Sequence, residues 1–284
     1  MTARQDGFLG LSSAGFHHAA FLDWGDPASA RPVTICVHGL TRNSHDFDML
    51  AAALADDGRV ICPDIVGRGA SDWLGNPADY SYPQYLSDMT ALIARLQAEA
   101  VDWIGTSMGG LIGMLLAAQP NTPIKRLVLN DIGPFIGKAA LQRISDYVGL
   151  DYRFSSVEAL ERHLRKIHAP FGPLTDRQWA HMAHHGSRQL ADGNFGLAYD
   201  PHIADNVKLA IADVDLWSIW DRIACPVLVL RGADSDILSP ETAQAMTERG
   251  PRAKLATFPD IGHAPALMSG DQIDIVRSWL ADHR

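Results

Sequence analysis

The chain of 284 residues has only three cysteines, no uninterrupted apolar run that approaches 18 residues, and an excess of acidic over basic side chains. Cys36, Cys62 and Cys225 each lie in or beside an apolar, strand-like run, and none forms a CxxC pair. We therefore expect small buried thiols in a reducing compartment, with no disulfide framework. The shortness of the apolar runs argues against a membrane-spanning helix.

The excess of acidic side chains argues against two classes of binding partner, nucleic acids and membranes. The chain has 24 Lys and Arg against 33 Asp and Glu, a formal net charge of −9. Such a chain lacks the basic face of a nucleic-acid-binding protein and the polybasic segment of a membrane anchor. The first seven residues are polar and contain no apolar core of signal-peptide length. We expect a cytoplasmic protein that acts on a small molecule.

Short apolar runs alternate with longer amphipathic segments along most of the chain. Near-continuous apolar runs of this length are typical of strands buried on both faces. The predicted strands are Val33–Val37, Arg59–Cys62, Asp102–Gly105, Arg126–Leu129, Val227–Leu230 and Lys254–Phe258, and the predicted helices between or after them are Ser44–Asp56, Tyr82–Glu99, Ser107–Gln119 and Asp271–Asp282. The alternation predicts an α/β fold with a mostly parallel sheet flanked by helices. An antiparallel pair is expected within Phe8–Leu22.

The strand–helix rhythm breaks between about Gly133 and Asp215. This stretch has no strong strand pattern, and its helix-like pieces at Lys138–Val148, Val157–Ile167 and Asp176–His185 are separated by Gly and Pro. The rhythm resumes at Cys225. We predict a core formed by residues 1–132 and 216–284, with residues 133–215 as an inserted helical cap.

A candidate nucleophile stands at a predicted strand-to-helix turn. The motif Gly105-Thr106-Ser107-Met108-Gly109 follows one predicted strand and opens a helix. A nucleophile at the tip of so tight a turn needs small neighbours, which the glycines supply. The helix N-terminus beneath Ser107 favours negative charge that forms there. An ordinary turn with a surface serine is the competing interpretation.

Backbone donors and a base are predicted from two further turns. His38-Gly39 ends the first core strand, so that the N–H of Leu40 and the N–H of Met108 could form an oxyanion hole, while His38 itself is expected to pin the loop. His263, in a loop between the last strand and the last helix, is the candidate base. The cluster His181-x-x-His184-His185 has no evident third metal ligand, so we expect no metal site there.

The base needs a carboxylate to orient it, and three are available. Asp236 ranks first, because it follows the predicted strand Val227–Leu230 and precedes the predicted helix start at Pro240. Asp234 ranks second and can instead brace the turn. Asp131, just after the predicted strand Arg126–Leu129, ranks third.

Together these features resemble the α/β-hydrolase superfamily over nearly the whole chain. The landmarks are Val37-His38-Gly39, Asp64 to Asp72, Gly105 to Gly110, Gly232 to Pro240, and Gly262-His263. The resemblance implies the roles of nucleophile for Ser107, acid for Asp236 and base for His263, and it is nearest to bacterial capped serine esterases and lipase-like hydrolases. The spacing from Gly232 to Asp236 is one residue longer than the family pattern, which keeps Asp234 open.

Several functions share this set of residues. The preferred prediction is hydrolysis of carboxylic esters through an acyl-enzyme. A C–C bond hydrolase, a lactonase or an amidase would use the same triad. A non-catalytic ligand receptor could share the fold. The chemistry requires no metal or organic cofactor. Phe135, Ile136 and Trp179 are candidates to line an apolar substrate pocket, although each could simply pack the cap. A homodimer is a prior expectation that rests only on how common such dimers are.

Overall fold

The computed structural model describes residues 2–29, 31–209 and 211–283, and its centre is an eight-stranded sheet. The strand order is β1-β2-β4-β3-β5-β6-β11-β12. The bounds are β1 Arg4–Ser12, β2 Gly15–Trp24, β3 Val33–Val37, β4 Val60–Pro63, β5 Val101–Thr106, β6 Ile124–Asn130, β11 Val227–Gly232 and β12 Lys254–Phe258. All six strands from β4 to β12 in this order run parallel, while β2 pairs antiparallel with both β1 and β4. The predicted fold class is confirmed.

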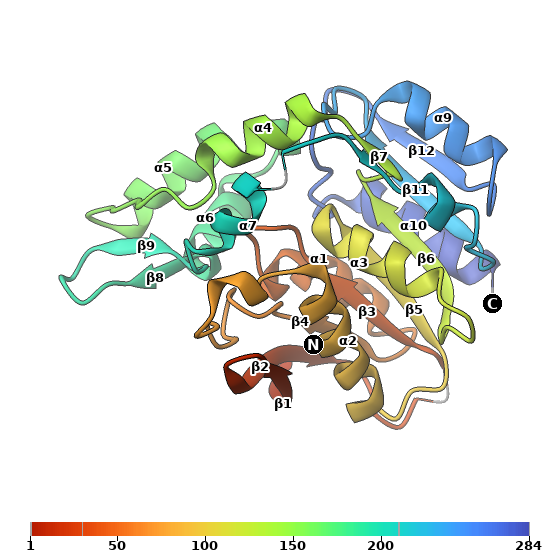
Figure 1. Cartoon of the computed structure of the whole chain (residues 1–284), viewed down its shortest axis with the longest axis horizontal. Coiled ribbons are helices and arrows are strands. Elements are labelled where there is room, and N and C mark those ends of the chain that lie inside the picture. Colours follow the sequence, from red (N-terminus) through yellow and green to blue (C-terminus); the bar gives the residue numbers. More distant parts are fainter. Residues whose placement is uncertain (1, 30, 210, 284) are drawn as a thin grey trace.

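Alternation along the strands divides the core between the two faces of the sheet. In β3, Cys36 packs with α1 (Asp48–Leu54) and α10 (Gly270–Asp282), whereas its neighbours Ile35 and Val37 belong to the opposite cluster. That second cluster includes side chains of α2 (Tyr82–Arg95), α3 (Met108–Ala117), α8 (Trp217–Trp220) and α9 (Pro240–Glu248). Successive side chains of a strand point to opposite faces, so the sheet is covered on both sides. The helices around the sheet are visible in Figure 1.

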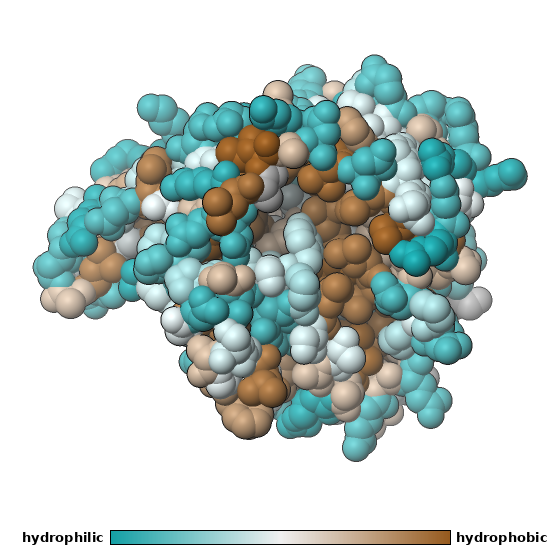
Figure 2. All heavy atoms as spheres, in the orientation of Figure 1, coloured by the Kyte–Doolittle hydropathy of each residue, from teal (hydrophilic) through white to brown (hydrophobic). Residues whose placement is uncertain are grey.

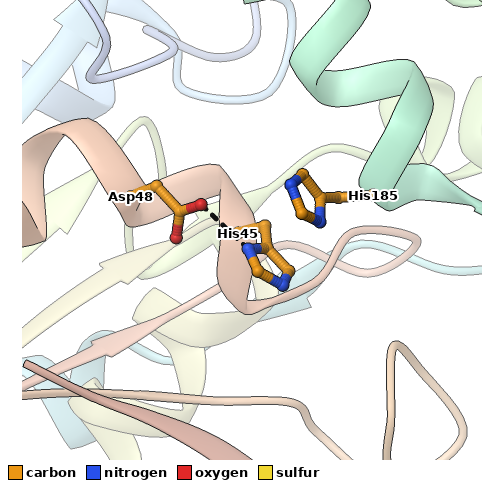
Figure 3. Close-up of side chains that lie close together, drawn as sticks. All are labelled: His45, Asp48 and His185. Atoms are coloured by element: carbon orange, nitrogen blue, oxygen red, sulfur yellow. Dashed lines mark hydrogen bonds and ion pairs between the residues drawn. The ribbon is translucent and has the colours of Figure 1, made fainter. Parts of the chain in front are cut away.

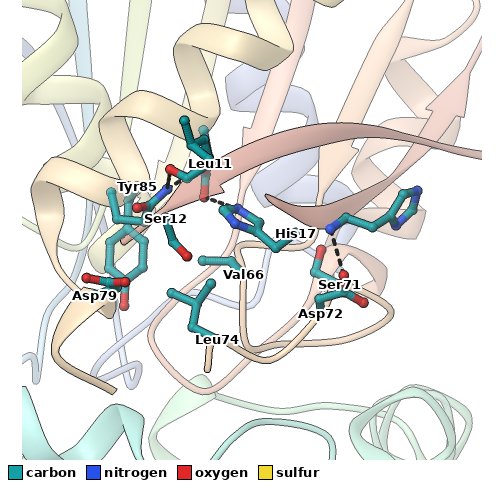
Figure 4. Close-up of polar contacts among 12 residues, drawn as sticks. Leu11, Ser12, His17, Val66, Ser71, Asp72, Leu74, Asp79 and Tyr85 are labelled. Carbon is teal, nitrogen blue, oxygen red and sulfur yellow. Dashed lines mark hydrogen bonds and ion pairs between the residues drawn. The ribbon is translucent and has the colours of Figure 1, made fainter. Parts of the chain in front are cut away.

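The β1–β2 hairpin is fixed to the rest of the core by polar contacts. His17 Nε2 lies 3.1 Å from Asp88 Oδ2 of α2, and both side chains are buried. Farther along β2, the Ala20 N–H donates to Ser71 Oγ and the His18 N–H donates to Asp72. Figure 4 shows His17 on the hairpin, with Ser71 and Asp72 of the loop that follows β4 beside it. The expected antiparallel pair within Phe8–Leu22 is therefore present, and its two strands extend beyond that range.

Residues 133–215 contain helices and short strands that project to one side of the sheet (Figure 1). They are η3 Ala169–Phe171, α4 Lys138–Tyr147, α5 Val157–Ile167, α6 Asp176–Gly186, α7 Ile203–Leu209, β7 Phe135–Ile136, β8 Ser187–Gln189, β9 Phe195–Leu197 and β10 Val214–Asp215. Three of these helices match the predicted ones within a residue or so. The strands were not predicted, because two or three residues carry too little alternation to recognise.

This projecting segment is anchored on the core by hydrogen bonds. The Tyr80 hydroxyl donates to Asp200 Oδ2 at 2.6 Å, and the Gly262 N–H donates to the Pro170 carbonyl at 2.7 Å. Among the described residues, no helix is both long and apolar enough to cross a membrane.

The junction of β5 and α3 depends on a close approach between backbones. A Cβ built on Gly109 would overlap the carbonyl oxygen of Val37 in β3, whereas a Cβ on Gly137 would meet nothing within 4 Å. We expect Gly109→Ala to lower the free energy of unfolding by about 3 kcal/mol, because backbone atoms must shift. Gly137, with φ −71°, is the matched control, and Gly137→Ala should change stability by less than about 0.5 kcal/mol. Urea denaturation followed by circular dichroism measures both, and equal stabilities would contradict the steric argument.

Candidate active site

Ser107 occupies a strained turn between β5 and α3. Its backbone angles are φ 51° and ψ −114°, a left-handed conformation that is costly for a residue with a side chain. A Cβ at Gly105 would overlap the backbone of Gly109 and Gly110, so the turn can close this tightly only with glycine there. Its sharpness holds the Ser107 hydroxyl partly exposed at the carboxyl edge of the sheet, where ligand sites of parallel sheets are found.

Three side chains from separate loops form one chain of hydrogen bonds. Ser107 Oγ lies 3.0 Å from His263 Nε2, and His263 Nδ1 lies 2.8 Å from Asp131 Oδ2. The spacing is that of a nucleophile, a base and an orienting carboxylate. The serine and histidine singled out in the sequence are therefore brought together.

Asp131 is fully buried and accepts hydrogen bonds on both carboxylate oxygens. Oδ1 accepts from the Gly232 N–H at 2.9 Å, and Oδ2 accepts from Ser235 Oγ at 2.5 Å as well as from His263. A buried carboxylate is tolerated when such donors compensate for the lost water. Asp131 has φ 57°, which directs it from the end of β6 toward this group.

The preference for Asp236 as the partner of His263 is wrong in this structure. Asp236 lies on the surface in an ion pair with Arg143, whose Nη2 is 3.0 Å from its Oδ1. Asp234 is also exposed, and its N–H donates to the Ile261 carbonyl. The loop after β11 approaches Asp131 with the Gly232 N–H and the Ser235 hydroxyl. This loop thus supplies hydrogen-bond donors to Asp131, the carboxylate that ranked third in the sequence analysis.

The loop expected to carry one of the two oxyanion donors passes close to Ser107. The Cβ that would be built on Gly39 lies 3.8 Å from Ser107 Cβ, and Leu40 is the next residue of that loop. Met108, the other expected donor, directly follows Ser107 at the start of α3. Arg68, fully buried, supports this loop by donating from Nε to the Leu40 carbonyl, and its Nη2 lies 3.6 Å from Met108 Sδ.

His38 pins the same loop, as the sequence indicated. Its Nε2 accepts from the Ile65 N–H at 3.0 Å, so Nδ1 carries the proton and donates to the Gly39 carbonyl at 2.7 Å. Burial lowers the pKa of His38 to about 4. The imidazole is therefore neutral at neutral pH and serves as a structural bridge.

A small pocket lies between the loop that carries Leu40 and the projecting segment. It is lined by Thr41, Arg42, Tyr147, Tyr152, Leu164, Ile167, His168, Gly186, Leu197 and Tyr199. In the view of Figure 2, apolar atoms gather over α3, outside this pocket. The pocket lining itself mixes apolar side chains with tyrosine hydroxyls and one guanidinium.

The three candidate pocket residues are placed away from this lining. Ile136 pairs with Val214 in the short β7–β10 ladder and is buried in the main core, and its neighbour Phe135 pairs with Asp215. Trp179 is buried in the packing of α5 against α6, with the Arg165 guanidinium 5.6 Å from its ring centroid. Trp179 thus packs the projecting segment and Ile136 the main core, and none of the three lines the pocket.

Some supporting residues were not found from the sequence. Ser235 was passed over because a turn serine carries no distinctive pattern, and Asn130 was not singled out because it lies just beyond the predicted strand Arg126–Leu129. Asn130 Nδ2 donates to Thr106 Oγ1 at 3.0 Å and to the Pro265 carbonyl at 2.8 Å, which ties the serine turn to the histidine loop. Its position beside Asp131 was the available signal.

Comparisons with known proteins agree with this fold. A family model described as the alpha/beta hydrolase fold matches residues 32–267. A 3-hydroxybutyrate-oligomer hydrolase from Cupriavidus necator is 46% identical over 274 residues, which cover 93% of each chain. Among solved structures, a putative hydrolase from Rickettsia typhi has a TM-score of 0.91 at 34% identity over 99% of both chains. An alpha/beta hydrolase from Novosphingobium aromaticivorans has a TM-score of 0.88 at 38% identity over 100% of both chains.

The pKa of His38 makes stability depend on pH. In the unfolded chain His38 takes up a proton near its ordinary pKa of 6.5, but in the folded protein only near 4. The unfolded state therefore binds more protons between these values, and stability falls as the pH falls from 6.5 to 4. At about 1.4 kcal/mol per pKa unit, the His38 contribution is roughly 3 kcal/mol.

We expect His38→Gln to be less stable at pH 7 and to show a flatter loss of stability between pH 6.5 and 4, measured by urea denaturation at each pH. The exposed His18 is the matched control, and His18→Gln should keep the wild-type slope. An unchanged slope in His38→Gln would contradict the assignment.

Proposed function

Because the chain belongs to the α/β-hydrolase family, we propose that it is a serine hydrolase that cleaves carboxylic esters through an acyl-enzyme. The continuous hydrogen-bond chain from Ser107 through His263 to the buried Asp131 carries the proposal. Ester-hydrolysing relatives support the same reaction class, since they include an esterase from Mycobacterium tuberculosis, 27% identical over 80% of this chain.

The mechanism follows from the positions of the donors and acceptors. His263 Nε2 takes the Ser107 proton as Oγ attacks the ester carbonyl carbon, and Asp131 stabilises the imidazolium through Nδ1. The Leu40 and Met108 N–H groups stabilise the oxyanion of the tetrahedral intermediate. His263 then protonates the leaving alcohol, which departs and leaves the acyl group on Ser107. A water molecule, deprotonated by His263, releases the acid and restores the hydroxyl.

The substrate we propose is an ester of a short hydroxy acid, such as an oligomer of 3-hydroxybutyrate. The relative that shares 46% identity is named for that substrate. We further propose that residues 133–215 act as a lid over the site, because they supply most of the lining of the small pocket beside Thr41 and Arg42, which follow Leu40 in the chain.

Ser107→Ala tests the nucleophile and, with a panel of substrates, the ester class. Wild-type protein should hydrolyse p-nitrophenyl esters and 3-hydroxybutyrate dimers and trimers, and a fluorophosphonate probe should label it. Ser107→Ala should lose labelling and at least about 10⁴-fold of kcat/KM, because the nucleophile is gone. Unchanged thermal unfolding would show that the variant is folded.

The same assay separates the competing functions. If the protein cleaves lactones, amides or C–C bonds and leaves the other esters intact, the proposed triad acts on a different type of bond. Wild-type protein that shows neither labelling nor hydrolysis would favour a ligand receptor. Near wild-type turnover by Ser107→Ala would overturn the nucleophile.

A pair of carboxylate substitutions tests the acid. Asp131→Asn should lower kcat/KM roughly 10⁴-fold, because the amide no longer fixes the His263 tautomer. Asp236→Asn is the matched control: it breaks only an exposed ion pair with Arg143, so kcat/KM should stay within about twofold. Steady-state kinetics on one ester suffices. If Asp236→Asn were the damaging change, the acid would be misassigned.

A further inference from the structure

A second group of titratable side chains lies outside the candidate active site, where α6 meets the core. We call His45, Asp48, His181 and His185 the histidine–aspartate cluster. Asp48 Oδ2 lies 2.8 Å from His45 Nδ1 and 3.3 Å from His181 Nε2. The His185 ring stacks on His45 with ring centroids 3.6 Å apart. Figure 3 shows His45, Asp48 and His185. His45 and Asp48 come from the core, whereas His181 and His185 lie one helical turn apart on α6.

Hydrogen bonding within the cluster is incomplete. One carboxylate oxygen, Asp48 Oδ2, serves both His45 and His181, while the other, Oδ1, is buried and has no partner among the described residues. An unpaired buried carboxylate oxygen is costly. The arrangement therefore offers one more acceptor than the neighbouring protein groups use.

The imidazoles of the cluster have different surroundings. Burial, helped by the nearby His45 and His181, lowers the pKa of His185 to about 4. His181 Nε2 lies 3.1 Å from the His45 carbonyl oxygen as well as 3.3 Å from Asp48 Oδ2.

We propose that the histidine–aspartate cluster is a Zn²⁺-binding site, with ligands from His45, Asp48 and His185 and a fourth from His181. Ligand atoms of the first three already lie within 4.8 Å of one another. Tetrahedral zinc needs ligand atoms about 3.3 Å apart, so the stacked rings of His45 and His185 would have to turn until their nitrogens converge on the ion. Imidazole and carboxylate are ligands that suit zinc, and they disfavour Mg²⁺, which prefers oxygen alone.

The site has an entry path and a structural consequence. A groove lined by Asn43, Ser44, Asp64, His184 and Arg188 also includes the rings of His45 and His185. An ion could therefore reach the cluster from solvent. Because two ligands belong to the core and two to α6, the bound ion would fasten the proposed lid to the core at this point, next to the hydrogen bond from Asn43 Nδ2 to the His185 carbonyl.

Calorimetric titration of the metal-free, full-length protein with ZnCl₂ tests the site. We expect one ion per chain, a higher unfolding temperature with Zn²⁺, and no binding of Mg²⁺ in the same range. His185→Gln and Asp48→Asn should each weaken Zn²⁺ binding at least tenfold, because each removes a ligand. His18→Gln is the matched control, since His18 is exposed on β2 and lines neither the cluster nor the groove.

The result can overturn the proposal in three ways. Absence of Zn²⁺ binding by the wild-type chain would show that the cluster is only a proton-sharing network. Equal affinities of wild type and His185→Gln would place the ion elsewhere. Loss of binding in His263→Ala, with His185→Gln unaffected, would assign the ion to the active-site histidine. Thermal unfolding in EDTA shows whether each variant is folded. If His185→Gln does not fold, the Zn²⁺ affinity of Asp48→Asn tests the site instead.

Discussion

The buried carboxylate of Asp131 is the constraint on which the site depends. A carboxylate removed from water is stable only if nearby donors replace the lost hydration. The donors come from two separate loops, the Gly232 N–H and Ser235 hydroxyl after β11 and the His263 ring after β12. The hydrogen bonds to the Asp131 carboxylate thus hold two loops at the end of β6. Asn130 strengthens the same junction by binding the Pro265 carbonyl.

The serine side of the site is fixed by sterics and by buried polar bridges. Gly105 and Gly109 allow β5 and α3 to approach β3 so closely that Ser107 is forced into its left-handed turn. The loop that passes Ser107 is held by a neutral His38 and by the buried Arg68 guanidinium. These supports act on backbone groups, so the proposed oxyanion donors are positioned before any substrate arrives.

Much of the fold could be read from patterns of burial. The predicted strands Val33–Val37 and Lys254–Phe258 have the observed bounds, and the helix Val157–Ile167 does too. Their near-continuous or helical spacing of apolar residues leaves little choice of structure. The short ladders of residues 133–215, such as β7 with β10, could not be predicted because tertiary pairing creates them.

The sequence by itself determined the sheet, the serine turn and the histidine, because each depends on local spacing: glycines around Ser107, and a loop between a strand and a helix for His263. Only the tertiary structure decided the carboxylate. Asp131, Asp234 and Asp236 all follow parallel strands at one sheet edge, and sequence spacing favoured Asp236. Which of them faces His263 depends on how loops from β6, β11 and β12 fold over one another, and those contacts bury Asp131 while Asp236 remains in solvent with Arg143.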